Sequence, residues 1–381
     1  MDDMRRAGRR EVLRELGAEG PLADEILAYT DNPFDIGRLA GASLPLADEP
    51  HVTAWTDYAR EAEVHGVFTA LARRLVQLRF PIAPGISQTE DYRAATRRGR
   101  RPGDDRPGLG LERPGDLELT LHPTLAGRVP VLVAPHRPDF VALVQACSAR
   151  NEPEVVPDSM GACIVTGLNN WDRVERHRAA LGAARGAALS EGEWAEAFRD
   201  LVPRKEQYQD RFIILSREPY SAVPAGETGL TEAEWRERSV AIRLEHECTH
   251  YFTLRAFGVM RNNLLDEVLA DCAGLCHAFG RYDGRLALRF FGLDTFPSCR
   301  PDGRLGLYLG ALSPGAVGIL RVVLHRAVTG LDECLAGHDL RSRQQFSRVI
   351  VALAGLTLEE MGGSGVGAHL AGRLAQTPAV A

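Results

Sequence analysis

The chain has 381 residues, of which 45% are hydrophobic and 25% are charged, and its formal net charge at pH 7 is −6. This composition is ordinary for a globular protein with a substantial core. So small a negative charge provides no long-range attraction for nucleic acid or an acidic membrane surface, and neither is expected as a partner. No apolar stretch approaches the length of a membrane span.

The cysteines and the first residues indicate a compartment. Seven cysteines are odd in number, and they lack the spacing of a disulfide framework. No apolar run follows the first six residues, which therefore do not resemble a signal peptide. We expect the chain to remain in the reducing cytoplasm, where thiols stay free.

The N-terminal part of the sequence predicts helices. Over residues 1–80 the clearest helix runs from about Thr53 to Leu78, ahead of Pro81. Residues 97–116 are rich in Arg, Gly, Pro and Asp and have almost no apolar content, which indicates a loop or linker. The predicted division is therefore a helical N-terminal region, 1–115, and an α+β domain, 116–381.

Short strand candidates alternate with helices after this loop. Four strands are predicted at residues 117–121, 129–134, 163–166 and 212–215, and helices are predicted near 138–149, 171–188 and 192–201. The pattern predicts an α+β fold that is rich in helix and contains a small sheet.

Two histidines four residues apart, His246 and His250, lie in the next predicted helix, which begins at a capping box of Thr231 and Glu234. Residues four apart lie on one face of a helix, so both imidazoles can reach a single metal ion. Glu247 directly follows the first histidine and is expected to point beside the ion, toward its open coordination position. This pattern predicts a site for hydrolytic zinc chemistry.

A further predicted helix, from Leu264 to about Phe279 and capped by Asn263, supplies acidic residues. Glu267 and Asp271 are four residues apart and share one face of this otherwise apolar helix. Two carboxylates in such surroundings favour a bound cation.

Over about residues 243–275 the two helices resemble those of the gluzincin metallopeptidases, the thermolysin-like and neprilysin-like families. In that group a His-Glu-x-x-His helix precedes a helix with Glu-x-x-x-Asp, as in Glu267-Val-Leu-Ala-Asp271 here. The sixteen residues between His250 and Glu267 are fewer than in the thermolysin-like pattern, so no subfamily is assigned. The resemblance implies zinc ligands at His246, His250 and Glu267, a general base at Glu247, and a carboxylate at Asp271 that orients a ligand histidine.

The chemistry requires the same residue types. Zinc in a catalytic site takes three protein ligands and lowers the pKa of a water in the fourth position toward about 7. A nearby carboxylate can remove the proton of this water as it attacks a carbonyl group. A donor must also stabilise the developing oxyanion. Tyr251, Tyr308 and His325 are candidates, and we rank His325 first, with a packed helical histidine as the alternative interpretation.

The sequence thus predicts a small sheet next to a two-helix zinc site in the C-terminal half. The expected function is that of a cytosolic zinc metallopeptidase whose recessed cleft accepts short or unstructured peptides. One alternative is a zinc hydrolase of a nonpeptide amide in small-molecule metabolism. The other is a binding or regulatory protein with a structural or vestigial zinc site.

Overall fold

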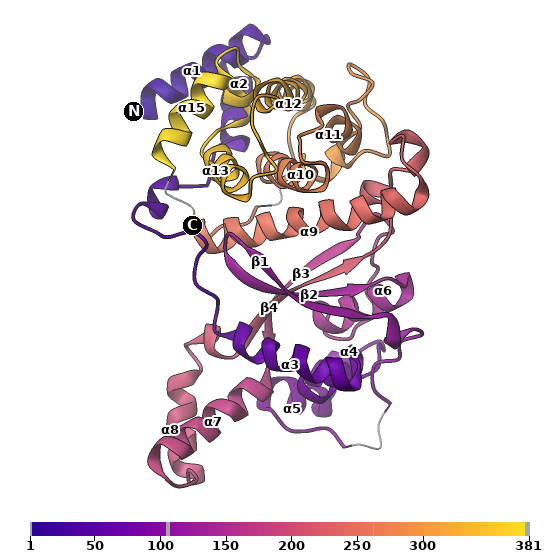
Figure 1. Cartoon of the computed structure of the whole chain (residues 1–381). Coiled ribbons are helices and arrows are strands. Elements are labelled where there is room, and N and C mark those ends of the chain that lie inside the picture. Colours follow the sequence, from indigo (N-terminus) through magenta and orange to yellow (C-terminus); the bar gives the residue numbers. More distant parts are fainter. Residues whose placement is uncertain (1, 104–106, 262, 378–381) are drawn as a thin grey trace. The chain divides into compact units, whose positions relative to one another are not determined.

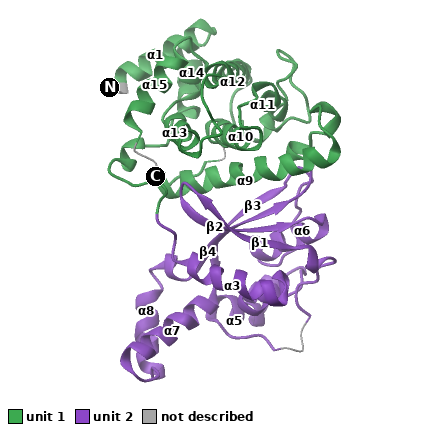
Figure 2. Cartoon of the chain, viewed as in Figure 1, with its two compact units in different colours: residues 1–46, 219–381 green, residues 47–218 purple. Residues whose placement is uncertain are grey.

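The computed structural model describes residues 2–103, 107–261 and 263–377 (Figure 1). The fold is α+β and rich in helix, with one small four-stranded sheet, as predicted. The chain forms two compact units (Figure 2). Unit 1 combines residues 1–46 with residues 219–381, and unit 2 consists of residues 47–218.

The sheet belongs to unit 2 and has the strand order β1-β2-β4-β3. β1 and β2 form an antiparallel hairpin. β4 pairs with β2 as a parallel strand and with β3 as an antiparallel strand. All four predicted strands are confirmed, each with one or more additional residues. Their bounds are Glu118–Thr124 (β1), Gly127–Ala134 (β2), Ala162–Asn169 (β3) and Gln209–Ser216 (β4).

The described residues of unit 2 also contain six α-helices. Trp55, Phe140 and Phe212 lie in the core of this unit without exposure to solvent. The single helix predicted from Thr53 to Leu78 is wrong, because Gly66 adopts a left-handed backbone that ends one helix and begins the next. The helices are His51–His65 (α3), Val67–Arg74 (α4), Glu90–Arg98 (α5), Arg137–Cys147 (α6), Trp171–Arg185 (α7) and Glu191–Leu201 (α8).

The described residues of unit 1 contain nine α-helices. They are Asp2–Glu15 (α1), Gly20–Tyr29 (α2), Glu232–Phe257 (α9), Leu264–Phe279 (α10), Gly284–Phe291 (α11), Pro314–Leu335 (α12), Arg343–Ala354 (α13), Leu358–Gly362 (α14) and Val366–Gln376 (α15). Within the described residues, no helix of the chain combines the length and the apolar character that a bilayer span requires.

The compact units do not follow the boundary that the sequence predicts near residue 115. α1 and α2 pack on α12 and α14, and a buried ion pair joins Arg9 to Glu359 at 3.3 Å. These contacts place the first 46 residues with the C-terminal half. Of the predicted loop 97–116, α5 takes the first two residues and a 3₁₀ turn the last three. Residues 104–106 lie outside the described part.

Local sequence signals determine where α9 and α10 begin, and the packing of these two helices forms the site. The predicted capping box of Thr231 and Glu234 starts α9, and Asn263 caps α10 by accepting a hydrogen bond from the Asp266 N–H at 3.1 Å. The two helices approach closely at Gly274, where a Cβ atom would lie only 2.6 Å from the carbonyl oxygen of Ile242. This contact brings the polar face of α10 onto the histidines of α9.

Candidate metal centre

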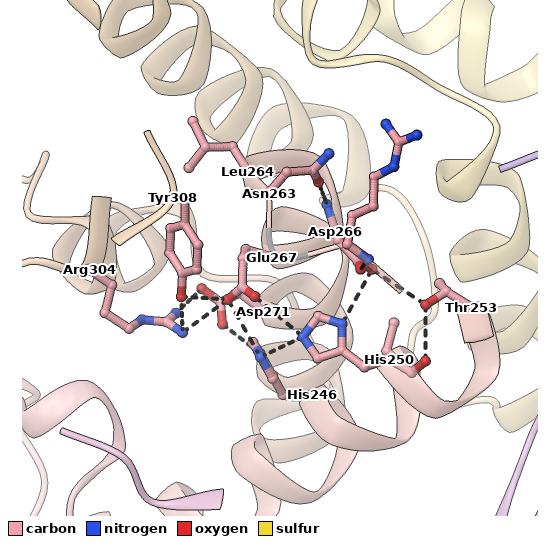
Figure 3. Close-up of polar contacts among 12 residues, drawn as sticks. His246, His250, Thr253, Asn263, Leu264, Asp266, Glu267, Asp271, Arg304 and Tyr308 are labelled. Atoms are coloured by element: carbon pink, nitrogen blue, oxygen red, sulfur yellow. Dashed lines mark hydrogen bonds and ion pairs between the residues drawn. The ribbon is translucent and has the colours of Figure 1, made fainter. Parts of the chain in front are cut away.

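The two helices bring His246, His250 and Glu267 together (Figure 3). The histidines come from α9 and the glutamate from α10, and each is at most 7% exposed. One potential ligand atom from each residue lies within 4.8 Å of the other two. This buried group can hold a metal ion.

The distances within the group fit a small divalent ion. The Nε2 atoms of His246 and His250 are 3.1 Å apart, and Glu267 places one carboxylate oxygen 3.4 Å from Nε2 of His250 and the other 3.7 Å from Nε2 of His246. Ligands bonded at about 2.0–2.1 Å in tetrahedral geometry are separated by about 3.3 Å. These atoms offer lone pairs to one another, so a bound cation would satisfy all three together.

Asp271 and Tyr220 hold the ring of His246 from its other side. Nδ1 of His246 lies 2.9 Å from Oδ1 of Asp271 and 2.8 Å from the Tyr220 hydroxyl. Tyr220 donates its own proton to the same Oδ1 atom at 2.6 Å. A carboxylate at Nδ1 favours the tautomer whose Nε2 is free to bind a metal. Asp271 is thus in position for the role that the sequence predicts.

Asp266 faces the second histidine in the same way. Its Oδ1 lies 3.3 Å from Nδ1 of His250, an ion-pair distance without the alignment of a hydrogen bond. The side chain of Asp266 is fully buried and is fixed by the backbone N–H of Arg261, which donates to Oδ2 at 2.9 Å. Each histidine therefore has its own carboxylate from α10.

Two side chains from one short segment hold Glu267. The hydroxyl of Tyr308 donates to Oε2 at 2.7 Å, and Nη1 of Arg304 donates to the same atom at 3.3 Å. Oε1 is the atom that faces His250. The other Nη atom of Arg304 donates to Oδ2 of Asp271, so one guanidinium links both acidic residues of the α10 face.

The segment that carries Arg304 and Tyr308 is a 3₁₀ turn, Arg304–Leu307, followed directly by Tyr308. Tyr29 of α2 donates to the carbonyl oxygen of Tyr308 at 3.0 Å and accepts from the N–H of Leu264 at 3.2 Å. The Arg304 guanidinium lies within 6 Å of three aromatic rings, those of Tyr220, Phe290 and Phe291. Arg304 and Tyr308 are thus held rigidly beside the metal group.

Burial and charged neighbours shift the pKa values of the residues in this group. Burial raises the pKa of Glu267, but the neighbouring histidines and Arg304 outweigh it and hold that pKa far below its usual range. Burial lowers the pKa of His250, yet Asp266 and Glu267 raise it well above the ordinary value. Arg304 and His246 lower the pKa of Asp271 in spite of full burial.

Two other predicted residues take different positions. Glu247 lies on α9 between the two histidines, is partly exposed, and forms no hydrogen bond or ion pair with any described residue. Its oxygens are therefore free to accept a proton. His325 of α12 stacks on Phe296 with ring centroids 4.4 Å apart, and in the described residues no polar contact links it to the metal group. Its role as oxyanion donor stays a prediction.

Sequence reasoning missed several residues of the centre. Tyr220 and Arg304 lie in 3₁₀ segments, which have no periodic pattern that would point to a site. Asp266 occupies the first turn of α10, where an acidic residue is ordinarily explained by the helix dipole. Its one available signal was its position beside Glu267. Tyr308, one of the three candidate oxyanion donors, donates its hydroxyl hydrogen to Glu267 at 2.7 Å.

Comparison with known proteins gives a family without an assigned activity. No curated protein matches the chain, and no solved structure does. A family model matches residues 11–364, which is most of the chain. The protein belongs to the family of unknown function DUF7005.

Proposed function

We propose that this protein is a zinc-dependent hydrolase that cleaves a peptide or a similar amide bond. The observation that carries the proposal is the convergence of Nε2 of His246, Nε2 of His250 and a carboxylate oxygen of Glu267 within 4.8 Å. Two imidazoles and one carboxylate form a ligand set that catalytic zinc uses, with one position left for water. Zinc is therefore the proposed metal.

The surroundings of the group support a catalytic ion more than a structural one. Structural zinc sites are closed by four protein ligands, usually with cysteine among them. Here three ligands converge, and no fourth His, Cys, Asp or Glu joins the group in the described part of the chain. A three-ligand set leaves room for a reacting molecule.

Each side chain then has a task. Asp271 and Asp266 orient the two histidines, while Tyr308 and Arg304 hold one oxygen of Glu267 and leave the other directed at His250. Zinc in this group would supply Lewis acidity, lowering the pKa of water toward about 7 and polarising a carbonyl oxygen. Glu247 accepts the proton of the attacking water and passes it to the leaving nitrogen.

The choice of an amide substrate rests on the resemblance of residues 243–275 to the gluzincins. The substrate is proposed to be a short or unstructured peptide. Hydrolysis of a nonpeptide amide uses the same zinc chemistry and is one outcome of the experiment below.

The experiment compares the zinc-loaded wild type with Glu247→Gln on a mixed peptide library, with cleavage read by mass spectrometry. Loss of the general base should slow cleavage by roughly 10²–10⁴-fold, while zinc content stays at one ion per chain. Glu245→Gln is the matched control, because Glu245 lies on the same helix, two residues away, and is partly buried as well. This control should retain full activity.

His246→Ala provides the second control, since loss of a ligand should remove the zinc. Equal cleavage by Glu247→Gln and wild type would show that Glu247 is not the base. Hydrolysis of small amides but of no peptide would correct the substrate class. A wild type that binds no more zinc than His246→Ala would refute the metal centre.

A further inference from the structure

Contacts of both its ring and its backbone hold Tyr220 in place at the metal centre. Its side chain is 4% exposed, its ring packs edge-on against Phe290 with centroids 4.8 Å apart, and its backbone N–H donates to Oγ of Ser239 at 2.9 Å. The guanidinium groups of Arg304 and Arg243 lie over the ring at 5.2 and 5.6 Å. A phenol packed in this way has one available orientation.

The backbone after Tyr220 adopts a conformation that non-glycine residues rarely take. Ser221 and Ala222 have φ angles of 52° and 56°, in the left-handed region, and Ser221 is buried. Consecutive left-handed residues without glycine persist only where surrounding contacts impose them, and they are concentrated at functional sites. The turn is anchored to α9 by Trp235, whose Nε1 donates to the carbonyl oxygen of Val223 at 2.7 Å. This strained turn therefore fixes the position of Tyr220, the residue directly before it.

The hydroxyl of Tyr220 forms a triangle with His246 and Asp271. The three edges, from hydroxyl to Oδ1, from hydroxyl to Nδ1 and from Nδ1 to Oδ1, measure 2.6, 2.8 and 2.9 Å. Oδ1 accepts from the hydroxyl, and it also accepts from Nδ1 when the imidazole carries its hydrogen on that atom. If the hydroxyl instead donated to Nδ1, the neutral imidazole would carry its hydrogen on Nε2 and could not bind a metal through that atom. The direction of the Tyr220 proton therefore decides which tautomer of His246 is stable.

We propose that Tyr220 is a positioning residue of the metal centre, which fixes Asp271 so that His246 presents an unprotonated Nε2 to the ion. The proposal rests on the proposed zinc function and deepens it. Tyr220 and His246 pin Oδ1 of Asp271, while Arg304 pins Oδ2, so the carboxylate cannot rotate away from the imidazole. Tyr220 acts on the metal only through this carboxylate.

The variant Tyr220→Phe keeps the packed ring and removes only the hydroxyl. Zinc affinity, measured by competition with a chromophoric chelator, should fall by about 10–100-fold, the usual effect of losing a group that orients a metal ligand. Cobalt substituted for zinc should give a changed visible absorption spectrum in this variant, because the ligand geometry loosens. Far-UV circular dichroism establishes that the variant is folded.

The matched control is Tyr58→Phe in unit 2. Tyr58 is also fully buried and donates to a carboxylate, that of Asp172, at 2.7 Å. It should lose a comparable hydrogen bond without any change in zinc affinity or cobalt spectrum.

The outcomes separate this proposal from the proposed function. If the wild type binds zinc and Tyr220→Phe matches it in affinity and cobalt spectrum, Tyr220 has no positioning role and the zinc function stands. If the wild type binds no more zinc than His246→Ala, the zinc function itself fails. Should Tyr220→Phe not fold, ¹⁵N resonances of His246 in the zinc-loaded wild type decide the matter. Nδ1 carrying the hydrogen is expected, and coordination through Nδ1 would overturn the proposal.

Discussion

Each unit contains a completely buried aspartate, Asp210 in unit 2 and Asp271 in unit 1, that accepts hydrogen bonds from three side chains. In unit 2, Asp210 accepts hydrogen bonds from Nε1 of Trp55 at 2.8 Å, from Nδ2 of Asn170 at 2.6 Å and from Arg173 at 2.7 Å. In unit 1, Asp271 accepts from an aromatic hydroxyl, a ring nitrogen and an arginine in the same way. Both carboxyl groups are therefore buried with one arginine and two further side-chain donors, as buried polar groups require.

The two networks differ in the groups that the donor residues contact next. Asn170 accepts the first backbone N–H groups of α7, and Arg173 donates to the carbonyl oxygens of Glu206 and Gln209, so these partners of Asp210 end in the main chain. His246 instead has a second ring nitrogen, which faces two other acceptors. A buried polar network whose side chains all bond to the main chain stabilises the fold. A network in which the lone pairs of several side chains point at one position can bind a cation there.

The pKa values of these two carboxyl groups also shift in opposite directions. Burial raises the pKa of Asp210 above its ordinary value, although Arg173 and Asn170 oppose this change. Burial has the same effect on Asp271, but Arg304 and His246 outweigh it and lower the pKa. The charged form is thus favoured where a ligand histidine needs a permanent acceptor.

The largest effect that this comparison predicts is on stability in unit 2. Arg173→Met leaves the buried Asp210 without its cation and should cost about 3–5 kcal/mol of the free energy of unfolding. Urea titration followed by tryptophan fluorescence measures this loss. Arg176→Met on the same helix is the control, because that ion-paired arginine is 39% exposed and should cost at most about 1 kcal/mol.

Zinc affinity of Arg173→Met should equal that of the wild type, because Asp210 and its partners belong to unit 2 and the metal group to unit 1. Equal losses of stability in the two arginine variants would contradict the assigned importance of the buried pair. A loss of zinc affinity in Arg173→Met would contradict the separation of the two networks.

The next effect concerns the aspartates themselves. Asp271→Asn removes the charge that orients His246, and zinc affinity should fall by about 10–100-fold, or about 1.4–2.7 kcal/mol. Isothermal titration with a competing chelator measures this change. Asp210→Asn makes the same chemical substitution in unit 2 and should leave zinc affinity unaltered. The comparison fails if both variants bind zinc equally well.

The smallest effect is on the pH dependence of stability. Because the pKa of Asp210 is raised on folding, the folded protein holds an extra proton between about pH 3.9, the unfolded value, and the raised pKa. Stability that Asp210 contributes therefore falls as pH rises through this window, and Asp210→Asn should abolish that slope. Asp172 provides the opposite case.

Burial raises the pKa of Asp172 too, but Tyr58, Arg176 and Arg74 outweigh it, and the net shift is downward. The contribution of Asp172 is present above its unfolded pKa and is lost as pH falls through the folded value. Differences in unfolding free energy between wild type and Asp172→Asn should thus change with pH in the reverse sense to those for Asp210→Asn. Parallel profiles for the two variants would show that the pKa directions are wrong.

The helices that carry the ligands could be predicted because their signals are local. A capping box, an asparagine cap and residues four apart determine which side chains share a face of α9 or α10. The α+β class followed equally from short strands between helices. Sequence spacing placed Asp271 on the same helix face as Glu267, and the resemblance to the gluzincins implied its role toward a ligand histidine. In the structure Oδ1 of Asp271 lies 2.9 Å from Nδ1 of His246.

The remaining features depend on contacts between distant segments. Arg304 meets Asp271 across 33 residues, and Tyr220 meets it across 51, without a repeat that relates their positions. The division into units likewise depends on ion pairs such as that of Arg9 with Glu359, 350 residues apart. The helix predicted over 53–78 failed for a local reason, since the left-handed conformation of Gly66 does not follow from hydrophobic periodicity.

The discontinuity of unit 1 sets an order of events during protein synthesis. All residues of unit 2 have left the ribosome once residue 218 has emerged, whereas α1 and α2 can pack on each other but not on α12 and α14 until those helices emerge. At translation rates of about 5–20 residues per second, synthesis from residue 219 to Gly362, the end of α14, takes roughly 7–30 s. Unit 2 can therefore fold first, whereas the faces of α1 and α2 that pack on α12 and α14 stay uncovered until those helices have been made.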